Sequence, residues 1–274
     1  MNEQVVQPAA EIHPIDRLLR ADRLPHILCP GCGIGTVIHG YAHAIAASGV
    51  PEDQHVCVSG IGCSGRAAGY VNVDSYHTTH GRALPFALGI AVHNPELNVT
   101  VISGDGDLTA IGGNHLIHAA RRNVNLNVIC INNFNYGMTG GQVGPTTPVG
   151  ARGTTAPLGV VEQPFNLPYL AKATGAVFVA RWTILHVREF QDAVLRSMQK
   201  EGFCFIEVLA PCPTSFGRAN RIGDGLDEVE IYRERCRVRN GAPDLEQLDI
   251  DLLDENKAIT VGNFVDVERK AFLQ

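Results

Sequence analysis

Short, almost continuously apolar runs alternate along the chain with longer segments in which apolar side chains recur at helical spacing. The short runs are rich in β-branched residues and predict buried parallel strands at residues 55–59, 98–103, 126–131, 176–180 and 203–209. The longer segments predict helices at residues 33–48, 83–93, 107–122 and 184–198. This alternation indicates an α/β fold with a doubly wound, mostly parallel sheet, and we expect the last of these strands to end the sheet.

Both ends of the chain lack this periodicity. Residues 1–25 contain three prolines around a short charged segment, so we expect an extended N-terminal arm that lies on another surface. Residues 218–274 form a charged tail, and we expect a C-terminal arm that packs on a partner chain. The one large domain then spans residues 26–217. Within it, residues 138–168 are rich in Gly, Thr and Pro and predict a long ordered loop.

Composition excludes several classes of function. The 274 residues are 45% hydrophobic and 18% charged, which is typical of a globular protein with a large buried core. A net charge of -6 without lysine or arginine clusters argues against binding nucleic acid. No apolar stretch reaches the roughly 18 to 20 residues that cross a bilayer, and the N-terminus does not resemble a secretion signal. We therefore expect a cytoplasmic protein that does not bind membranes.

Polar motifs follow two of the predicted strands. Gly104, Asp105 and Gly106 come directly after one strand, and Asn132 and Asn133 end the next. A right-handed crossover between the two strands would bring these motifs together. Mg²⁺ prefers about six oxygens at roughly 2.1 Å, and Asp105, Asn133 and a carbonyl just beyond it could supply three of them. The glycines would let backbone amides approach a phosphate at the start of the following helix.

The spacing of the two motifs is more informative than either motif alone. There are 26 residues between Gly106 and Asn133, and Gly-Asp-Gly followed by Asn at about this interval resembles the signature of thiamine diphosphate sites. The alternative is a pair of ordinary turns. A second Gly-Asp-Gly, at residues 223–225, follows no predicted strand, so we interpret it as a surface turn.

Four of the eight cysteines lie in predicted loops. Cys29 and Cys32 form a CxxC motif, while Cys63 and Cys212 each lie beyond a predicted strand, at the edge where open α/β sheets bind ligands. Four converging thiolates would hold either Zn²⁺ or a [4Fe-4S] cluster, and ligand number alone does not separate the two. A redox dithiol is the other interpretation of the CxxC motif. We expect the remaining cysteines, Cys57, Cys130, Cys204 and Cys236, to lie outside the site.

Six motifs in order resemble the β subunits of 2-oxoacid:ferredoxin oxidoreductases. They are residues 29–33 (CPGCG), 62–66 (GCSGR), 77–82 (HTTHGR), 104–107 (GDGD), 132–142 (NNFNYGMTGGQ) and 211–213 (PCP). The match extends from about residue 12 to residue 217. It implies a thiamine diphosphate-binding fold of the pyrophosphate type, and it is strongest to members that use 2-oxoglutarate, with pyruvate as the alternative substrate.

The resemblance assigns the candidate site residues. It implies that Cys29, Cys32, Cys63 and Cys212 hold one [4Fe-4S] cluster, and that Asp105, Asn133 and the carbonyl of Asn135 bind Mg²⁺. The cofactor contacts that it implies are Ile61, Gly62, Cys63, Ser64, His80, Gly104, Asp105, Gly106, Asp107, Asn133, Gly137, Met138 and Thr139. Because thiamine diphosphate itself performs the carbon chemistry, no catalytic side chain is assigned, and His80 is the only candidate.

The family reaction is reversible oxidative decarboxylation of a 2-oxoacid with coenzyme A. It yields an acyl thioester, here succinyl-CoA, together with CO₂ and two electrons for ferredoxin. In the family an α subunit supplies the glutamate that acts on the cofactor, so this chain is expected to be half of an active site in an (αβ)₂ assembly. Many members have a lysine where this chain has Gly140, so a role for that lysine is not transferred.

Two competing functions remain open from the sequence. A non-oxidative thiamine enzyme would need the metal motif but not the four cysteines. A non-catalytic iron-sulfur or zinc module would need the cysteines but not Asp105 and Asn133. Two histidines, His77 and His80, lie in a loop expected to face the cofactor, and Arg66 and Arg82 could bind a carboxylate or diphosphate or could simply connect loops.

Overall fold

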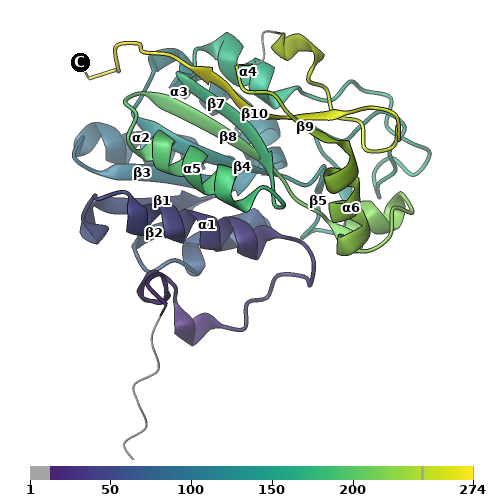
Figure 1. Cartoon of the computed structure of the whole chain (residues 1–274), viewed down its shortest axis with the longest axis horizontal. Helices are drawn as coiled ribbons and strands as arrows, with labels where there is room; N and C mark the ends of the chain where they lie inside the picture. Colours follow the sequence, from purple (N-terminus) through teal and green to yellow (C-terminus); the bar gives the residue numbers. More distant parts are fainter. Residues whose placement is uncertain (1–12, 242–243, 274) are drawn as a thin grey trace, which may run out of the picture.

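The structure is a computed structural model that describes residues 13–241 and 244–273. It contains an eight-stranded sheet with the order β2-β1-β3-β4-β8-β7-β10-β9 (Figure 1). The strands are β1 His55–Ser59, β2 Asp74–His77, β3 Asn98–Gly104, β4 Leu126–Asn132, β7 Phe178–Thr183, β8 Phe203–Leu209, β9 Cys236–Val238 and β10 Ile259–Asp266. All neighbours are parallel except β7 and β10. A separate ribbon is formed by β5 Asn135–Tyr136 and β6 Gln142–Val143.

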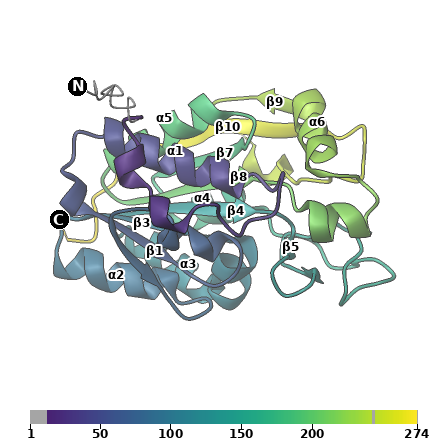
Figure 2. The same cartoon turned by 90° about the horizontal axis from the view of Figure 1, so that it is seen from below.

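Helices cover both faces of the sheet (Figures 1 and 2). One face carries α1 Ile34–Ala47 and α5 Val187–Met198, which pack against each other. The other face carries α2 Ala83–His93, α3 Gly113–Arg122 and α4 Leu167–Thr174. The predicted doubly wound α/β fold is therefore confirmed, as three layers with the sheet in the middle.

Alternation of side chains along the central strands builds two separate cores. In β4, Val128 and Cys130 join the core beneath α2 to α4, whereas Ile129 and Ile131 join the core beneath α1 and α5. Every residue of β4 is buried, because both faces of the strand are covered and neighbours pair with it on both sides. This explains why the run is continuously apolar rather than alternating with polar residues.

The predicted end of the sheet was wrong. Strand β8, at 203–209, lies inside the sheet between β4 and β7, and β10 extends the sheet by pairing antiparallel with β7. The segment 218–274, expected to be an arm, thus contributes two strands and the helix α6 Gly225–Arg235. A bulge between Asn263 and Val265 interrupts the alternation of β10, so the sequence pattern there is weak. Whether this segment also packs on a partner stays a prediction.

Shorter elements also differed from the expectations. The second Gly-Asp-Gly is not an isolated turn, because Asp224 caps the N-terminus of α6 in a capping box with Asp227. The helix expected at 107–122 is divided into a π-helical turn, Gly106–Ile111, and α3. Strand β2 and helix α4 were not predicted.

The described part of the predicted N-terminal arm lies against the domain itself. Ile15 and Leu18 are buried in the core, and Leu19 forms a bridge with Val71. The expected arm at residues 1–12 lies outside the described residues. Among the described helices, none is long and apolar enough to cross a membrane.

A buried ion pair connects three strands. Arg181 of β7 donates to Glu207 of β8 at 2.6 Å, and Glu207 also accepts from Asn132 of β4 at 2.7 Å. Arg181 further donates to the carbonyl of Leu248, which holds the C-terminal segment on the sheet. Both charged groups are almost completely buried, so each depends on its partner for compensation.

We expect Arg181→Met to lower the free energy of unfolding by about 3 to 5 kcal/mol, because Glu207 would remain buried without its cation. The matched control is Arg17→Met, which breaks an exposed pair with Glu52 and should cost about 1 kcal/mol or less. Urea denaturation measures both. Replacing Glu207 by Leu in the Arg181→Met background should recover most of the loss, and equal losses in the two single variants would contradict this account.

Candidate active site

The site lies where the carboxyl ends of the parallel strands meet. Loops after β1, β2, β3 and β4 form one pocket. Its lining residues are Ile61, Gly62, Cys63, Ser64, His80, Gly104, Asp105, Gly106, Asp107, Asn133, Asn135, Tyr136, Gly137, Met138 and Thr139. The structure thus brings together every residue that the sequence analysis assigned to the cofactor or to Mg²⁺. Tyr136 is the one lining residue that was not assigned.

Asp105 is a buried carboxylate with little compensation. It is 2% exposed, and its Oδ2 accepts a short hydrogen bond from the hydroxyl of Thr146. Burial raises the pKa of Asp105 to about 7, although the hydrogen bonds oppose that rise. A bound divalent cation would supply the missing positive charge, because oxygen ligands of this kind suit Mg²⁺. Thr146 belongs to the predicted loop, but its contact with Asp105 had no signal in the sequence.

The segment after β4 is held in an uncommon turn. Phe134 has a φ of 62°, which is rare for a bulky residue, and its amide donates to the side chain of Asn132 at 3.1 Å. The side-chain amide of Asn135 donates to the carbonyl of Asn133 at 2.8 Å. Both Asn133 and Asn135 are nearly buried at the pocket wall. Asn133, Asn135 and Asp105 therefore line the same pocket.

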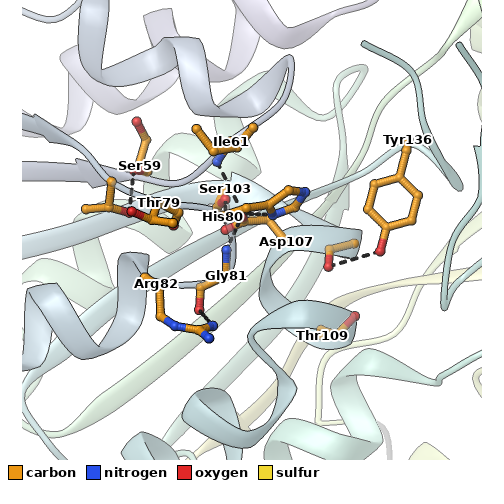
Figure 3. A network of polar contacts seen from close by, with 12 residues as sticks. Ser59, Ile61, Thr79, His80, Gly81, Arg82, Ser103, Asp107, Thr109 and Tyr136 are labelled. Carbon is orange, nitrogen blue, oxygen red and sulfur yellow. Dashed lines mark hydrogen bonds and ion pairs between the residues drawn. The ribbon is translucent and has the colours of Figure 1, made fainter. Parts of the chain in front are cut away.

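Asp107 connects the loops that follow three strands (Figure 3). Its Oδ1 accepts from the amide of Gly81 at 2.8 Å and from the amide of Ile61 at 3.2 Å, and its Oδ2 accepts from the hydroxyl of Ser103 at 2.8 Å. The ring nitrogen Nδ1 of His80 also lies 2.5 Å from Oδ1, outside the angular range of a hydrogen bond. Both carboxylate oxygens are engaged by the protein, so Asp107 fixes the shape of the pocket.

The aromatic rings of His80 and Tyr136 contact each other at the pocket wall. The ring of His80 meets that of Tyr136 edge-on, with 6.1 Å between the centroids and 68° between the planes (Figure 3). The Tyr136 hydroxyl donates to the carbonyl of Gly106 at 3.4 Å. Burial raises the pKa of Tyr136, and the nearby carboxylates of Asp105 and Asp107 add to that rise. Tyr136 lies inside the 132–142 motif, which was the only sequence signal for it.

Gly106 is required by this arrangement. A Cβ at this position would lie 2.3 Å from Cε1 of Tyr136, closer than non-bonded carbons approach. The absence of a side chain at Gly106 therefore lets Tyr136 pack directly over the start of the π-helical turn. Such turns often occur at functional sites.

A second pocket contains the four candidate cysteines. Its lining residues are Ile27, Leu28, Cys29, Cys32, Ile34, Cys63, Asn133, Gly137, Met138, Pro211, Cys212, Pro213 and Thr214. The two pockets share Cys63, Asn133, Gly137 and Met138. Among the described residues, no three His, Cys, Asp or Glu side chains are grouped closely enough to hold a single metal ion. The four thiols instead line a common space.

The four thiols influence one another electrostatically. Burial, together with the neighbouring Cys212, Cys29 and Cys32, raises the pKa of Cys63 to about 11. Burial also raises the pKa of Cys32. Thiols of this kind ionise only when a cation compensates their charge, as metal coordination does. The other four cysteines lie in strands and do not line this pocket, as expected.

The remaining candidates have structural contacts. His77 approaches the carbonyl of Gly65 at 2.9 Å and does not line either pocket, in contrast to His80. Arg82 donates to the carbonyl of Gly81 at 3.3 Å, and neither Arg82 nor Arg66 lines either of these two pockets.

Comparisons with known proteins agree with this geometry. Residues 60–208 match the family model described as thiamine pyrophosphate enzyme, C-terminal TPP binding domain. The chain is 46% identical over 263 residues to the 2-oxoglutarate synthase subunit KorB of Methanocaldococcus jannaschii, covering 96% of each chain. It is 52% identical over 196 residues to the protein of the same name from Archaeoglobus fulgidus, covering 72% of this chain and 73% of that one.

A solved structure is also similar. It is the 2-oxoglutarate:ferredoxin oxidoreductase from Magnetococcus marinus with 2-oxoglutarate, coenzyme A and succinyl-CoA bound. The TM-score is 0.83 at 30% sequence identity, and the match covers 97% of this chain and 88% of that chain.

Gly106→Ala should reduce the stability of the protein by about 1 to 3 kcal/mol, because the new methyl group would displace the Tyr136 ring. It should also reduce the rise in melting temperature produced by thiamine diphosphate with Mg²⁺. The matched control is Gly113→Ala, also near the start of a helical segment, where an added Cβ would meet no atom within 4 Å. Thermal melting with and without the cofactor measures both variants. Equal melting temperatures and equal cofactor-induced shifts in Gly106→Ala and Gly113→Ala would mean that the contact with Tyr136 is unimportant.

Proposed function

The chain belongs to the family of 2-oxoglutarate synthase subunits KorB, and we propose that it is the β subunit of a coenzyme A-dependent 2-oxoglutarate:ferredoxin oxidoreductase. In this reaction 2-oxoglutarate, coenzyme A and two oxidised ferredoxins give succinyl-CoA, CO₂, one proton and two reduced ferredoxins, and the reverse reaction fixes CO₂. The observation that carries the proposal is the common wall between the pocket with Asp105 and Asn133 and the pocket with four cysteines.

The first pocket fits thiamine diphosphate and Mg²⁺. The chain contains a thiamine pyrophosphate-binding domain, and the pocket lies within the loops of that domain. Asp105, Asn133 and the carbonyl of Asn135 would hold Mg²⁺, and the buried, poorly compensated carboxylate of Asp105 is the feature that favours a cation. When bound, thiamine diphosphate would supply a nucleophilic carbon for the 2-oxo group and an electron sink that allows the carboxyl group to leave as CO₂. The residues that line the pocket would position it.

The second pocket fits a [4Fe-4S] cluster held by Cys29, Cys32, Cys63 and Cys212. Oxidation of the substrate releases two electrons, and these need an acceptor beside the carbon chemistry. Cys63 and Gly137 line both pockets, so a cluster there would be adjacent to the cofactor. Zinc has no redox chemistry and would leave the electrons without an exit. Binding of a single Zn²⁺ would also require the four thiols to move closer together, because they are not grouped closely enough to hold one ion.

A partner subunit completes the enzyme. The names of the relatives describe a subunit, and we propose an α subunit in an (αβ)₂ assembly. In the described part of the chain no glutamate lines the thiamine pocket, so the acidic group that acts on the cofactor would come from the partner. The loop after β6 exposes Leu158 at 97% and Val161 at 83%, which supports a covered surface there. The C-terminal segment is a second candidate contact for the α subunit.

Two alternatives from the sequence are less well supported. A non-oxidative thiamine enzyme leaves the cysteine pocket without a purpose, and a non-catalytic iron-sulfur or zinc module leaves Asp105 and Asn133 without one. Pyruvate remains the alternative substrate, and the names of the relatives favour 2-oxoglutarate. We propose a cytoplasmic location, since the eight cysteines form no disulfide and the cluster ligands must stay reduced.

The reaction is tested with the complex that co-purifies with this chain, under anaerobic conditions and with coenzyme A. We expect methyl viologen reduction with 2-oxoglutarate and at least tenfold less with pyruvate. Faster reduction with pyruvate would show that pyruvate, rather than 2-oxoglutarate, is the substrate. No reduction with either substrate would contradict the proposed reaction.

Cys212→Ser should remove the electron paramagnetic resonance signal of the reduced cluster while thiamine diphosphate still binds with similar affinity. The matched control is Cys236→Ser in β9, which lies outside both pockets and should leave signal and binding unchanged. A full cluster signal in the Cys212 variant would remove this residue from the ligand set.

Asp105→Asn should weaken thiamine diphosphate binding and leave the cluster in place. It removes the carboxylate charge proposed to hold Mg²⁺ but does not change the cysteines. Calorimetry should show at least a tenfold loss of thiamine diphosphate affinity, with an unchanged cluster signal. Retained affinity would exclude Asp105 as a metal ligand.

A further inference from the structure

Helix α6 lies beside the cysteine pocket without lining it. Its first turn contacts the CxxC loop, because a Cβ placed on Gly31 would lie 3.2 Å from Cα of Gly225. One turn further along the helix, Oε2 of Glu228 accepts a hydrogen bond from the amide of Cys212 at 3.2 Å. The helix therefore contacts two of the segments that carry the candidate cluster ligands.

Glu228 is a buried carboxyl group that the proposed chemistry does not use. Its side chain is 1% exposed, and Oε1 has no hydrogen-bond partner among the described residues. A Cβ placed on Gly217 would lie 2.6 Å from this oxygen, so the absence of a side chain at Gly217 makes room for it. Burying a polar group without a partner costs free energy. The one hydrogen bond of the Glu228 side chain, from Cys212, is therefore the contact that needs an explanation.

Both polar main-chain groups of Cys212 are occupied. Its carbonyl accepts from the amides of Ser215 at 3.3 Å and Gly217 at 3.0 Å, within the π-helical turn Pro213–Gly217. Its amide donates to Glu228, whereas its thiol donates to Oδ1 of Asn135 at 3.6 Å. The positive end of this amide dipole thus points at a carboxyl oxygen of α6 and not at a sulfur of the cysteine pocket.

We propose that Glu228 is a positioning residue that lowers the reduction potential of a cluster bound through Cys212. This inference rests on the proposed function, because it requires a cluster in the cysteine pocket. Amide groups that donate to the sulfurs of a cluster favour its reduced state, since reduction adds negative charge. By accepting the amide of Cys212, Glu228 keeps this donor away from the sulfurs. An electron that arrives from the substrate is then passed on to ferredoxin more readily.

A purely structural role for Glu228 predicts a different result. If Glu228 only held the turn after β8, its loss would lower the amount of cluster that assembles, but the assembled clusters would keep their potential. Tyr232 provides a comparison on the same helix, one turn after Glu228. It is 0% exposed, and its hydroxyl also has no partner among the described residues. Its hydroxyl does not engage Cys212, so it shares the burial of Glu228 but not its contact.

The test measures the midpoint potential of the cluster in the intact complex, by redox titration followed by electron paramagnetic resonance. The signal to follow is the one that is lost in Cys212→Ser. Glu228→Leu removes the acceptor, and the methyl group of Gly217→Ala should displace the carboxyl group while Glu228 itself is retained. In both variants we expect reduction to become at least tenfold more favourable, a positive shift of about 59 mV for a one-electron couple. If Glu228→Leu assembles no cluster, Gly217→Ala decides the question.

Two control variants separate the acceptor from packing. Glu228→Gln retains a carbonyl oxygen for the amide of Cys212, and Tyr232→Phe removes a buried hydroxyl from the same helix. Both should keep the midpoint potential of the unmodified complex. Iron content per chain, measured for every variant, reports how much cluster has assembled.

An unchanged midpoint potential in Glu228→Leu and Gly217→Ala would overturn the proposal, whatever their iron content, because Glu228 would then act only on stability. Equal shifts in Glu228→Leu and Glu228→Gln would also overturn it, because the acceptor would not be the cause. Absence of the cluster signal from the unmodified complex would instead contradict the proposed function.

Discussion

The carboxylate of Asp107 holds together the loops that follow three adjacent strands, and the remaining geometry of the site depends on it. Parallel strands bring their carboxyl ends to one edge of the sheet, but this alone leaves the loops free to take many arrangements. The amides of Ile61 and Gly81 and the hydroxyl of Ser103 all donate to this one buried group. The loops that follow β1 and β2 are therefore positioned relative to the π-helical turn that begins directly after Asp105.

The protein satisfies Asp107 internally and leaves its neighbours incomplete. Asp105, two residues earlier, has one side-chain hydroxyl as a partner, and the thiols of Cys32 and Cys63 have pKa values raised by burial. Groups of this kind are costly when they are charged and uncompensated. The proposed Mg²⁺ and the proposed cluster would each supply the missing cation. Binding of the cofactors would then contribute to folding stability as well as to chemistry.

The sequence predicted the parts of the fold whose signals are local. Strands β3 and β4 are covered on both faces, so their apolar runs were recognisable, and the polar residues at their ends identified the site. Strand β2 was missed because Asp74–His77 is a short, largely exposed edge strand. Strand β10 was missed because it pairs with β7, about 80 residues earlier, and a bulge interrupts its alternation. No local pattern encodes such a distant partner.

The same limit applied to the site. Residues in the first few positions after a strand, such as Asp105 and Cys63, were predicted because topology brings the ends of parallel strands to one edge of the sheet. The contact of Thr146 with Asp105 and the packing of Tyr136 on Gly106 depend on how a long loop folds back over the pocket. Gly137 also belongs to that loop, and a Cβ there would lie 3.1 Å from Sγ of Cys212 and 3.9 Å from Sγ of Cys63. Gly137 contributes only main chain to the wall that the two pockets share, so any side chain introduced at this position would press on the thiol of Cys212 and alter both pockets at once.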